Sequence, residues 1–335
     1  MKNKITLKEL AKLLNVSVST VSKALHDSPE ISPKTAERVK ELAKLHNYRP
    51  NPVAVNLKSS KSGTIGVIIP NISNTFFANV LLGIEARAQK SGLQVITYIS
   101  NEKLEREQQI AEMLTSGFVD GVLIAISEET QRKKEYDHLF NLVDYDIPVV
   151  LYDRINLDLQ VDKIGIDDEY SLEEATRMLQ SRGIKKIGIA TSIHHLGVGK
   201  LRITGYRNAL KNRDDFYIAN SSKPDSLREK TQKLLVEDKV EAILCTDFVS
   251  TMMVYRLAYE NKISIPKDLK VIGFLNADVA RFLTPSISYV EQFPEEIGEE
   301  AVDLLVNRIE NRIAGKQPIN KTINTKLIHL ESTDF

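Results

Sequence analysis

The chain has 335 residues, and its 45 Lys and Arg balance its 45 Asp and Glu. This length allows two or three domains with substantial cores. The one cysteine, Cys245, lies in an apolar run and is expected to be a buried free thiol, which excludes a disulfide framework. No apolar stretch approaches about 18 residues, and the N-terminus has no signal-peptide pattern, so we expect a cytoplasmic protein rather than an exported or membrane-inserted one.

The charge is unevenly distributed along the chain. Residues 1–62 contain ten Lys and two Arg against four Glu and one Asp, a net charge of +7, so the remaining 273 residues carry −7. A basic head on an acidic body is typical of a protein that holds DNA phosphates with one end only. An ordinary solvated helical surface would give the same count, so the charge alone leaves both interpretations open.

The first 25 residues carry the pattern of a helix-turn-helix. Thr6 and Glu9 have the spacing of a capping box, in which each side chain bonds the backbone amide of the other residue. A short helix with one apolar face follows, and after the turn at 15–16 a second helix begins with a cap at Ser17. This second helix leaves a small, polar and cationic face outward, formed by Val18, Ser19, Ser22 and Lys23. Such a face is typical of a helix that reads base edges in the major groove.

A third helix and a short hinge segment complete this head. Ser32-Pro33 is a helix cap followed by proline at the first helical position, and the apolar stripe behind it closes a three-helix core. Residues 48–52 cannot stay helical, and Asn51 can cap a new segment at 52–58. A helix of about two turns is unstable by itself, so we expect it to form only when it packs against DNA.

The runs Thr6–Ala11 and Val16–Leu25, followed by Tyr48-x-Pro50-Asn51 and Ala54-x-x-Leu57, resemble the lactose-repressor (LacI/GalR) family of bacterial transcription regulators. The resemblance covers essentially the whole chain. It implies that Leu57 wedges between base pairs from the minor groove, the alternative being a linker leucine that packs on the body. The DNA contacts expected on this basis are Thr6, Ser17, Val18, Ser19, Thr20, Ser22, Lys23, Asn51, Ala54 and Leu57.

Beyond a polar linker, short apolar runs alternate with amphipathic helical patterns. Strands are expected at 65–69, 95–98, 121–125, 149–152, 164–166, 187–190, 242–245, 271–274, 288–290 and 326–330. Helices are expected at 76–91, 104–116, 171–182, 201–212, 226–237, 250–261 and 295–314. Apolar strands that alternate with helices predict an α/β body of two doubly wound parallel-sheet subdomains.

The expected domains are an all-α helix-turn-helix head at 1–50, a hinge helix and linker at 51–62, and an effector-binding and dimerisation domain at 63–335. The family resemblance implies a periplasmic-binding-protein-like body whose chain crosses three times between its subdomains. On that analogy one subdomain comprises roughly 63–161 and 292–322, and the other roughly 162–291 and 323–335.

Polar and aromatic side chains follow several of the expected strands. Ligands of open parallel sheets bind beyond the carboxyl ends of the strands. Paired charged groups and neighbouring rings suit a polyhydroxylated ligand. For each residue alone, a helix cap, an ion pair or a core aromatic is the alternative. The expected effector contacts are Asn74, Phe76, Phe77, Asp153, Arg154, Ser192, Arg202, Thr246, Asp247 and Leu275.

Leu275 stands at a departure from the family pattern. The family usually has two aspartates at the end of the motif that here reads Gly273-Phe274-Leu275-Asn276, and the first of them often binds the effector. Leucine cannot accept hydrogen bonds. Because this carboxylate is missing while Arg154 and Arg202 remain, the sequence slightly favours an acidic or phosphorylated sugar over a neutral one.

Enzyme and cofactor motifs are not predicted. Gly197-Val198-Gly199 lacks the third glycine of a dinucleotide fingerprint, and Gly199-Lys200 lacks the rest of a P-loop. His194 and His195 are adjacent in sequence and have no nearby carboxylate or cysteine, so we expect loop residues rather than metal ligands. No nucleophile elbow is present.

We therefore expect a homodimeric regulator, most simply a repressor of carbohydrate-related genes. It would bind a pseudo-palindromic double-stranded operator on the nucleoid and respond to a sugar or sugar derivative, without a cofactor or a membrane. From the family resemblance, we expect this chain to lack the leucine-heptad tail with which some relatives form tetramers. The alternatives are a solute-binding protein, for the body alone, and a DNA-architectural protein, which would leave the body without a purpose.

Overall fold

The computed structural model describes residues 5–25, 27–48, 61–211, 215–310, 315 and 317–334. The chain divides into two compact units, Met1–Ser62 and Gly63–Phe335. The expected hinge segment lies outside the described residues, and with it the expected DNA contacts Asn51, Ala54 and Leu57. In the described ranges, no helix combines the length and the apolar character needed to cross a membrane.

The first unit is a three-helix head. Its helices are α1 (Leu7–Leu14), α2 (Val18–Leu25) and α3 (Pro33–Leu45). The predicted capping box at the start of α1 is present, since the Thr6 amide donates to Glu9 Oε2 at 2.7 Å and the Glu9 amide donates to Thr6 Oγ1. Ser32 caps α3 in the predicted way. The core is fully buried at Leu10, Val21, Ala24 and Val39.

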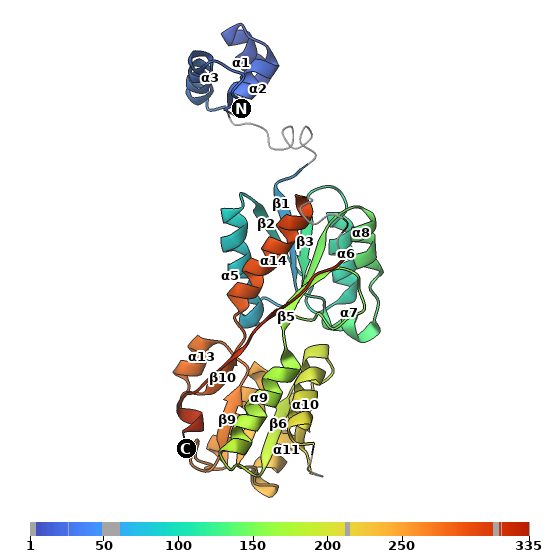
Figure 1. The fold of residues 1–335 in the computed structure, drawn as a ribbon, viewed down its shortest axis with the longest axis vertical. Coiled ribbons are helices and arrows are strands. Elements are labelled where there is room, and N and C mark those ends of the chain that lie inside the picture. Colours follow the sequence, from blue (N-terminus) through green and yellow to red (C-terminus); the bar gives the residue numbers. More distant parts are fainter. Residues whose placement is uncertain are drawn as a thin grey trace. The chain divides into compact units, whose positions relative to one another are not determined.

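The second unit contains two six-stranded sheets, which confirms the predicted α/β body (Figure 1). The first sheet is wholly parallel in the order β11-β5-β4-β3-β1-β2, and the second is parallel except for β12, in the order β12-β10-β9-β8-β6-β7. The strands are β1 (Thr64–Ile69), β2 (Gln94–Ile99), β3 (Gly121–Ile124), β4 (Val149–Tyr152), β5 (Asp162–Ile166), β6 (Ile187–Thr191), β7 (Tyr217–Asn220), β8 (Ala242–Cys245), β9 (Lys270–Gly273), β10 (Ser288–Glu291), β11 (Asn320–Ile323) and β12 (Lys326–Ile328).

Helices cover both faces of each sheet. The first sheet carries α5 (Thr75–Lys90), α6 (Leu104–Leu114), α7 (Glu128–Lys133), α8 (Asp137–Asp144) and α14 (Pro294–Ile309). The second carries α9 (Asp168–Ser181), α10 (Gly197–Ala209), α11 (Pro224–Gln232), which continues into a π-helical turn at Lys233–Glu237, α12 (Phe248–Glu260), α13 (Ala277–Phe282) and a 3-10 turn at Glu331–Thr333. The pattern did not predict β7, β11 or the short helices α7, α8 and α13.

Helices α5 and α14 lie side by side although they are far apart in sequence (Figure 1). Two glycines allow this close approach. A Cβ atom on Gly83 would lie 2.0 Å from the Glu295 carbonyl oxygen, and one on Gly298 would lie 2.2 Å from the Val80 carbonyl oxygen. The helix that follows the second chain crossing is thereby held against the helix that follows β1.

The chain passes between the sheets three times: from β5 to α9, from β10 to α14, and from β11 to β12. The expectation that places residues 162–166 in the second subdomain is wrong, because β5 pairs in parallel with both β4 and β11. The apolar pattern of a short strand identifies the strand but not the sheet that it joins. The first crossing therefore lies after Ile166.

Candidate functional site

A cavity of about 570 Å³ lies between the two subdomains of the second unit, beyond the carboxyl ends of the strands. This cavity is called the cleft. Eight of the ten expected effector contacts line it, namely Asn74, Phe76, Phe77, Asp153, Arg154, Arg202, Asp247 and Leu275. The sequence analysis missed further lining residues, among them Asn276, Glu291, Gln292 and Phe293. Pro294 begins α14, and this helix start is the local signal that could have identified Glu291, Gln292 and Phe293 as residues at the end of a strand.

Three polar side chains of the cleft serve as helix caps. Asn74 Oδ1 accepts from the Phe76 amide at 3.1 Å at the start of α5, and Asn276 Oδ1 accepts from the Val279 amide at 3.2 Å at the start of α13. Asp247 forms a capping box with Ser250 at the start of α12. A cap residue placed after a buried strand begins the next helix and at the same time faces the cleft, because both lie at the carboxyl end of the sheet.

Ser192 and Thr246 do not line the cleft in the described structure, although both are expected effector contacts. Their side chains are used within the protein. Ser192 donates from its amide and its hydroxyl to the Asp247 carboxylate, at 2.8 Å and 2.7 Å, and the Thr246 hydroxyl donates to the same carboxylate at 3.1 Å. With the Ser250 amide at 2.9 Å, four donors surround Asp247. Ser192 and Thr246 therefore hold Asp247 in place.

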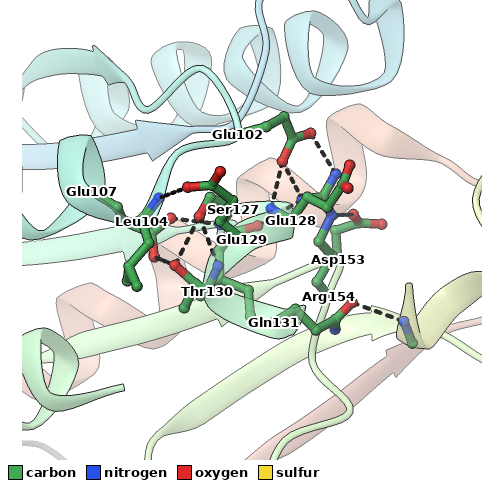
Figure 2. Close-up of polar contacts among 12 residues, drawn as sticks. Glu102, Leu104, Glu107, Ser127, Glu128, Glu129, Thr130, Gln131, Asp153 and Arg154 are labelled. Atoms are coloured by element: carbon green, nitrogen blue, oxygen red, sulfur yellow. Dashed lines mark hydrogen bonds and ion pairs between the residues drawn. The ribbon is translucent and has the colours of Figure 1, made fainter. Parts of the chain in front are cut away.

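Arg154 is buried and paired in the first subdomain (Figure 2). Its Nη1 and Nη2 donate to the two carboxylate oxygens of Glu102 at 2.6 Å and 2.7 Å, and Nη1 also donates to the Ile126 carbonyl at 2.9 Å. Burial opposes the charge, but the Glu102 carboxylate keeps the pKa of Arg154 raised. The guanidinium lies 5.6 Å from the ring centre of Phe77. Glu102 lies outside every motif, so the sequence does not identify this partner.

Arg202, on α10, is the buried arginine that lines the cleft from the second subdomain. Its Nε donates to Asp168 Oδ1 at 2.7 Å, Nη1 donates to the Thr246 carbonyl, and Nη2 donates to Gln292 Oε1 at 3.1 Å. Its guanidinium stacks on the ring of Phe274, with 3.9 Å between the guanidinium carbon and the ring centre. Asp168 begins α9 after the first crossing, and Gln292 lies in the second crossing. Arg202 thus joins two chain crossings.

Asp153 is a largely buried carboxylate of the cleft that accepts no hydrogen bond from the described part of the protein. Among the described residues its carboxylate has no hydrogen-bond partner, and the nearest cation is Arg154 Nε, 3.9 Å from Asp153 Oδ2. Its side chain is 13% exposed. Burial raises the pKa of Asp153 to about 6, against the lowering effect of Arg154. This carboxylate can accept hydrogen bonds from a bound molecule.

The apolar part of the cleft surrounds these groups. Leu275 is 7% exposed and packs in the core of the second sheet as well as lining the cleft. Phe76 and Phe77 meet edge to face at 5.3 Å on the opposite subdomain. Aromatic rings between polar groups can stack on the apolar face of a small ring-shaped ligand.

The expected DNA-contacting residues of the head lie on α2 and its cap. Val18 is 40% exposed, and Ser17 and Ser19 are also exposed. Ser17 Oγ accepts from the Thr20 amide at 3.0 Å, so the hydroxyls of this pair define the start of the helix. Lys23 forms an ion pair with Glu30, and Ser22 is half-buried. Thr6 is exposed and occupied in its capping box, which leaves Val18 and Ser19 as the freest side chains for base contacts.

Comparison with known proteins agrees with both units. Residues 6–51 match the model of the bacterial regulatory proteins of the lacI family, and residues 176–333 match that of a periplasmic binding protein-like domain. Catabolite control protein A of Priestia megaterium is 30% identical over 308 residues, which cover 90% of this chain and 91% of that protein. The chain belongs to the LacI family of bacterial regulatory proteins. The resemblance inferred from the motifs is therefore confirmed.

Solved structures of the LacI family share the fold of this chain. The lac repressor dimer bound to operator and the anti-inducer ONPF matches with a TM-score of 0.85 at 19% identity and covers 99% of each chain. A LacI family transcriptional regulator from Enterococcus faecium with bound ribose matches with a TM-score of 0.69 at 25% identity, covering 81% of this chain and 98% of that one. The lac repressor match therefore extends over both units of this chain, whereas the Enterococcus faecium regulator matches 81% of it.

Proposed function

We propose that this LacI-family regulator binds a specific operator through α2 and the hinge segment, and that a small sugar-like molecule in the cleft changes its operator affinity. One observation carries the proposal: a capped helix-turn-helix and a cleft lined with polar and aromatic groups occur in one chain. The ribose bound to the Enterococcus faecium relative supports a sugar as the class of ligand. The regulated genes are then carbohydrate-related, and repression is the mode of action.

The mechanism follows from where the cleft lies. A ligand that contacts both subdomains favours one closure angle between them. It can shift the populations of the open and closed forms only if its affinity for the two forms differs. The three crossings are the segments that must bend, and Arg202 holds two of them. Cleft occupancy would therefore be converted into a change in the angle between subdomains, and from there into the spacing of two heads. The proposal assigns no catalytic step to the cleft, and it places the regulator in the cytoplasm on nucleoid DNA.

The same proposal includes a homodimer, as in the operator-bound lac repressor structure. Strand β2 is an edge strand of the first sheet, and Ile96 on it is 40% exposed. Leu82 on α5, which packs beside β2, is 59% exposed. Exposed apolar side chains at a sheet edge commonly mark an interface between subunits. A two-fold dimer through this edge would set the distance between two half-sites.

The test combines operator selection with ligand screening. The full chain is used to select binding sites from random DNA, and a pseudo-palindromic motif is the expected result. Sugars are then screened by thermal shift, because a ligand at 100 times its Kd stabilises the folded state by about 2.7 kcal/mol. A sugar that shifts the melting temperature should also change operator affinity in a gel-shift titration. Selection that returns no motif, or a bound sugar without effect on operator affinity, would contradict the proposal.

A further inference from the structure

Both arginines of the cleft are already neutralised within the protein. Arg154 makes a two-pronged ion pair with Glu102, and Arg202 pairs with Asp168. The remaining donors of each guanidinium are partly taken by the carbonyls of Ile126 and Thr246. An arginine binds a carboxylate or phosphate strongly when its fork of parallel N–H groups is free. Neither arginine offers a free fork or an uncompensated charge to a ligand.

The helix N-termini around the cleft, which are the other usual anion sites, are occupied as well. Side chains cap α5 at Asn74, α12 at Asp247 and α13 at Asn276. Helix α14 carries Glu295 and Glu296 in its first turn. The Gly197 amide at the start of α10 donates to Gln131 Oε1 at 2.8 Å. At each of these helix starts, a side chain therefore already bonds a backbone amide or places a negative charge in the first turn, which disfavours a phosphate there.

Carboxylates dominate what remains of the lining. Among the described lining residues there are two arginines and no lysine, against six carboxylates: Asp153, Asp247, Asp278, Glu291, Glu295 and Glu296. Asp247 is held by four donors, whereas Asp153 has none. Asp278, Glu295 and Glu296 are exposed and lie toward solvent. An anion that enters the cleft would be repelled by these groups, whereas a hydroxyl or an ammonium group would satisfy Asp153.

We propose that the effector of this cleft carries no negative charge and binds the Asp153 carboxylate through a hydrogen-bond donor, as a neutral or amino-bearing polyol. The inference rests on the proposed function and narrows its ligand class. It reverses the expectation from the sequence of an acidic or phosphorylated sugar, because that expectation counted Arg154 and Arg202 as free. The raised pKa of Asp153, caused first by burial, agrees with a site that gains from a donor.

Matched sets of sugars test the charge preference directly. Glucose, glucosamine and glucose 6-phosphate form one set, and ribose with ribose 5-phosphate and cellobiose with cellobionic acid form two others. Binding to the full chain is measured by thermal shift and then by calorimetry at pH 7.5. In each set that binds, the anionic member should bind at least about tenfold more weakly than its neutral parent. An anionic member that binds more tightly than its parent overturns the inference. Absence of binding by every set counts against a sugar-like effector, and so against the proposed function.

Asp153→Asn identifies the group that selects the ligand, with Asp144→Asn as the matched control, because Asp144 is exposed at the end of α8 and does not line the cleft. Asparagine keeps the size of the side chain, and a cooperative unfolding transition of each variant shows that it folds. Asp153→Asn should lower the affinity for the neutral parent sugar by about tenfold or more, and the affinity for glucosamine by a larger factor. It should also reduce the difference in affinity between the parent sugar and its phosphate. Asp144→Asn should change none of these affinities. Unchanged affinities in Asp153→Asn would place the donor-binding group elsewhere and overturn the assignment.

The pH dependence separates an amino sugar from a neutral one. Asp153 loses its charge as the pH falls through about 6. The affinity for glucosamine should therefore fall between pH 7.5 and pH 5, whereas that for glucose should fall less. In Asp153→Asn, the affinities for glucosamine and for glucose should both vary less with pH. An affinity for glucose 6-phosphate that is high at pH 7.5 and independent of Asp153 would contradict the proposal.

Discussion

Arg202 and Asp168 form a buried ion pair that connects α10 to the first residue of α9. Arg202 Nε and Asp168 Oδ1 are 2.7 Å apart, and both side chains are 5% exposed. Burial raises the pKa of Asp168, and Arg202 acts in the opposite direction. Because α9 follows the first chain crossing and Gln292 in the second crossing also bonds Arg202, the pair lies where a change in the cleft can reach the segments that bend.

Arg202→Ala should remove the ligand response and destabilise the body. The loss of the arginine leaves Asp168 buried without a partner, which typically costs about 3 to 5 kcal/mol. The double variant Arg202→Ala/Asp168→Asn should recover part of this loss, since the unpaired charge is gone. Urea denaturation measures the free energy of unfolding of the single and the double variant. Arg177→Ala is the control, because its pair with Glu173 is half-exposed and contributes under about 0.5 kcal/mol. Equal stability of the single and double variants would show that Asp168 carries no unpaired charge.

Changes at Val18 and Ser19 should alter the half-site sequence that the head prefers. Both side chains are exposed at the start of α2. Lys23→Ala should cost about 1 to 3 kcal/mol of specific binding, and its partner Glu30 would be released. Selection from random DNA and gel-shift titration measure the two effects. Lys44→Ala on α3 serves as a charge-matched control that should keep the motif. An unchanged motif for a Val18/Ser19 double variant would refute the assignment.

Leu57→Ser should weaken operator binding strongly while dimer formation and sugar binding remain. Leu57 lies outside the described residues, so this prediction rests on the family resemblance of the motif Ala54-x-x-Leu57. An apolar wedge between base pairs costs a few kcal/mol of unstacking and gains a bend that serves both heads. Operator titration is compared with sedimentation and calorimetry of the same variant. Operator affinity equal to that of the unmodified chain would favour a linker leucine.

Gln131 on α7 and Gly197 on α10 link the two subdomains beside the cleft, which Leu196 and Val198 line. Gln131 Oε1 accepts from the Gly197 amide at 2.8 Å, and His195 Nε2 lies 3.2 Å from Glu128 Oε1. Gln131→Ala should weaken closure and reduce effector affinity by a factor of about 3 to 10, the contribution of one hydrogen bond of about 0.5 to 1.5 kcal/mol. Calorimetry measures the affinity, and Arg132→Ala on the same helix is the exposed control. An unaffected affinity in Gln131→Ala would mean that the contact does not change on closure.

The stability of the body should contain a contribution from Asp153 that decreases as the pH rises. Its pKa is raised to about 6 in the folded chain and is about 3.9 in an unfolded one. The folded state therefore binds the proton more tightly, so this contribution is present at low pH and is lost between about pH 4 and pH 7, by about 1 to 3 kcal/mol. Asp153→Asn should be more stable than the unmodified chain at pH 7.5 and no more stable at pH 4. Urea denaturation across this range gives the difference, and a difference that does not vary with pH would contradict the assignment.

Local patterns of the sequence determined the elements and the family. The Thr6–Glu9 capping box, the Ser32-Pro33 helix start and the apolar runs of β4 and β8 each involve residues within a few positions, so their physical causes are visible in the sequence. The motifs built from them were specific enough to identify a LacI-family head. The strand-end rule likewise brought eight of the ten expected residues to one cleft, because the carboxyl ends of parallel strands meet at one edge.

Only the tertiary structure decided which groups of the cleft are free. Glu102 and Arg154 are 52 residues apart, and Arg202 and Gln292 are 90 apart. No local pattern encodes such pairs, because they depend on how two sheets and three crossings are arranged. The same holds for β5, whose apolar run fits either sheet and whose hydrogen bonds place it between β4 and β11. An ion pair formed inside the protein cancels the charge that a ligand would meet. The net charge that the cleft presents to a ligand is therefore set by contacts between distant parts of the chain, and not by which residues line the cleft.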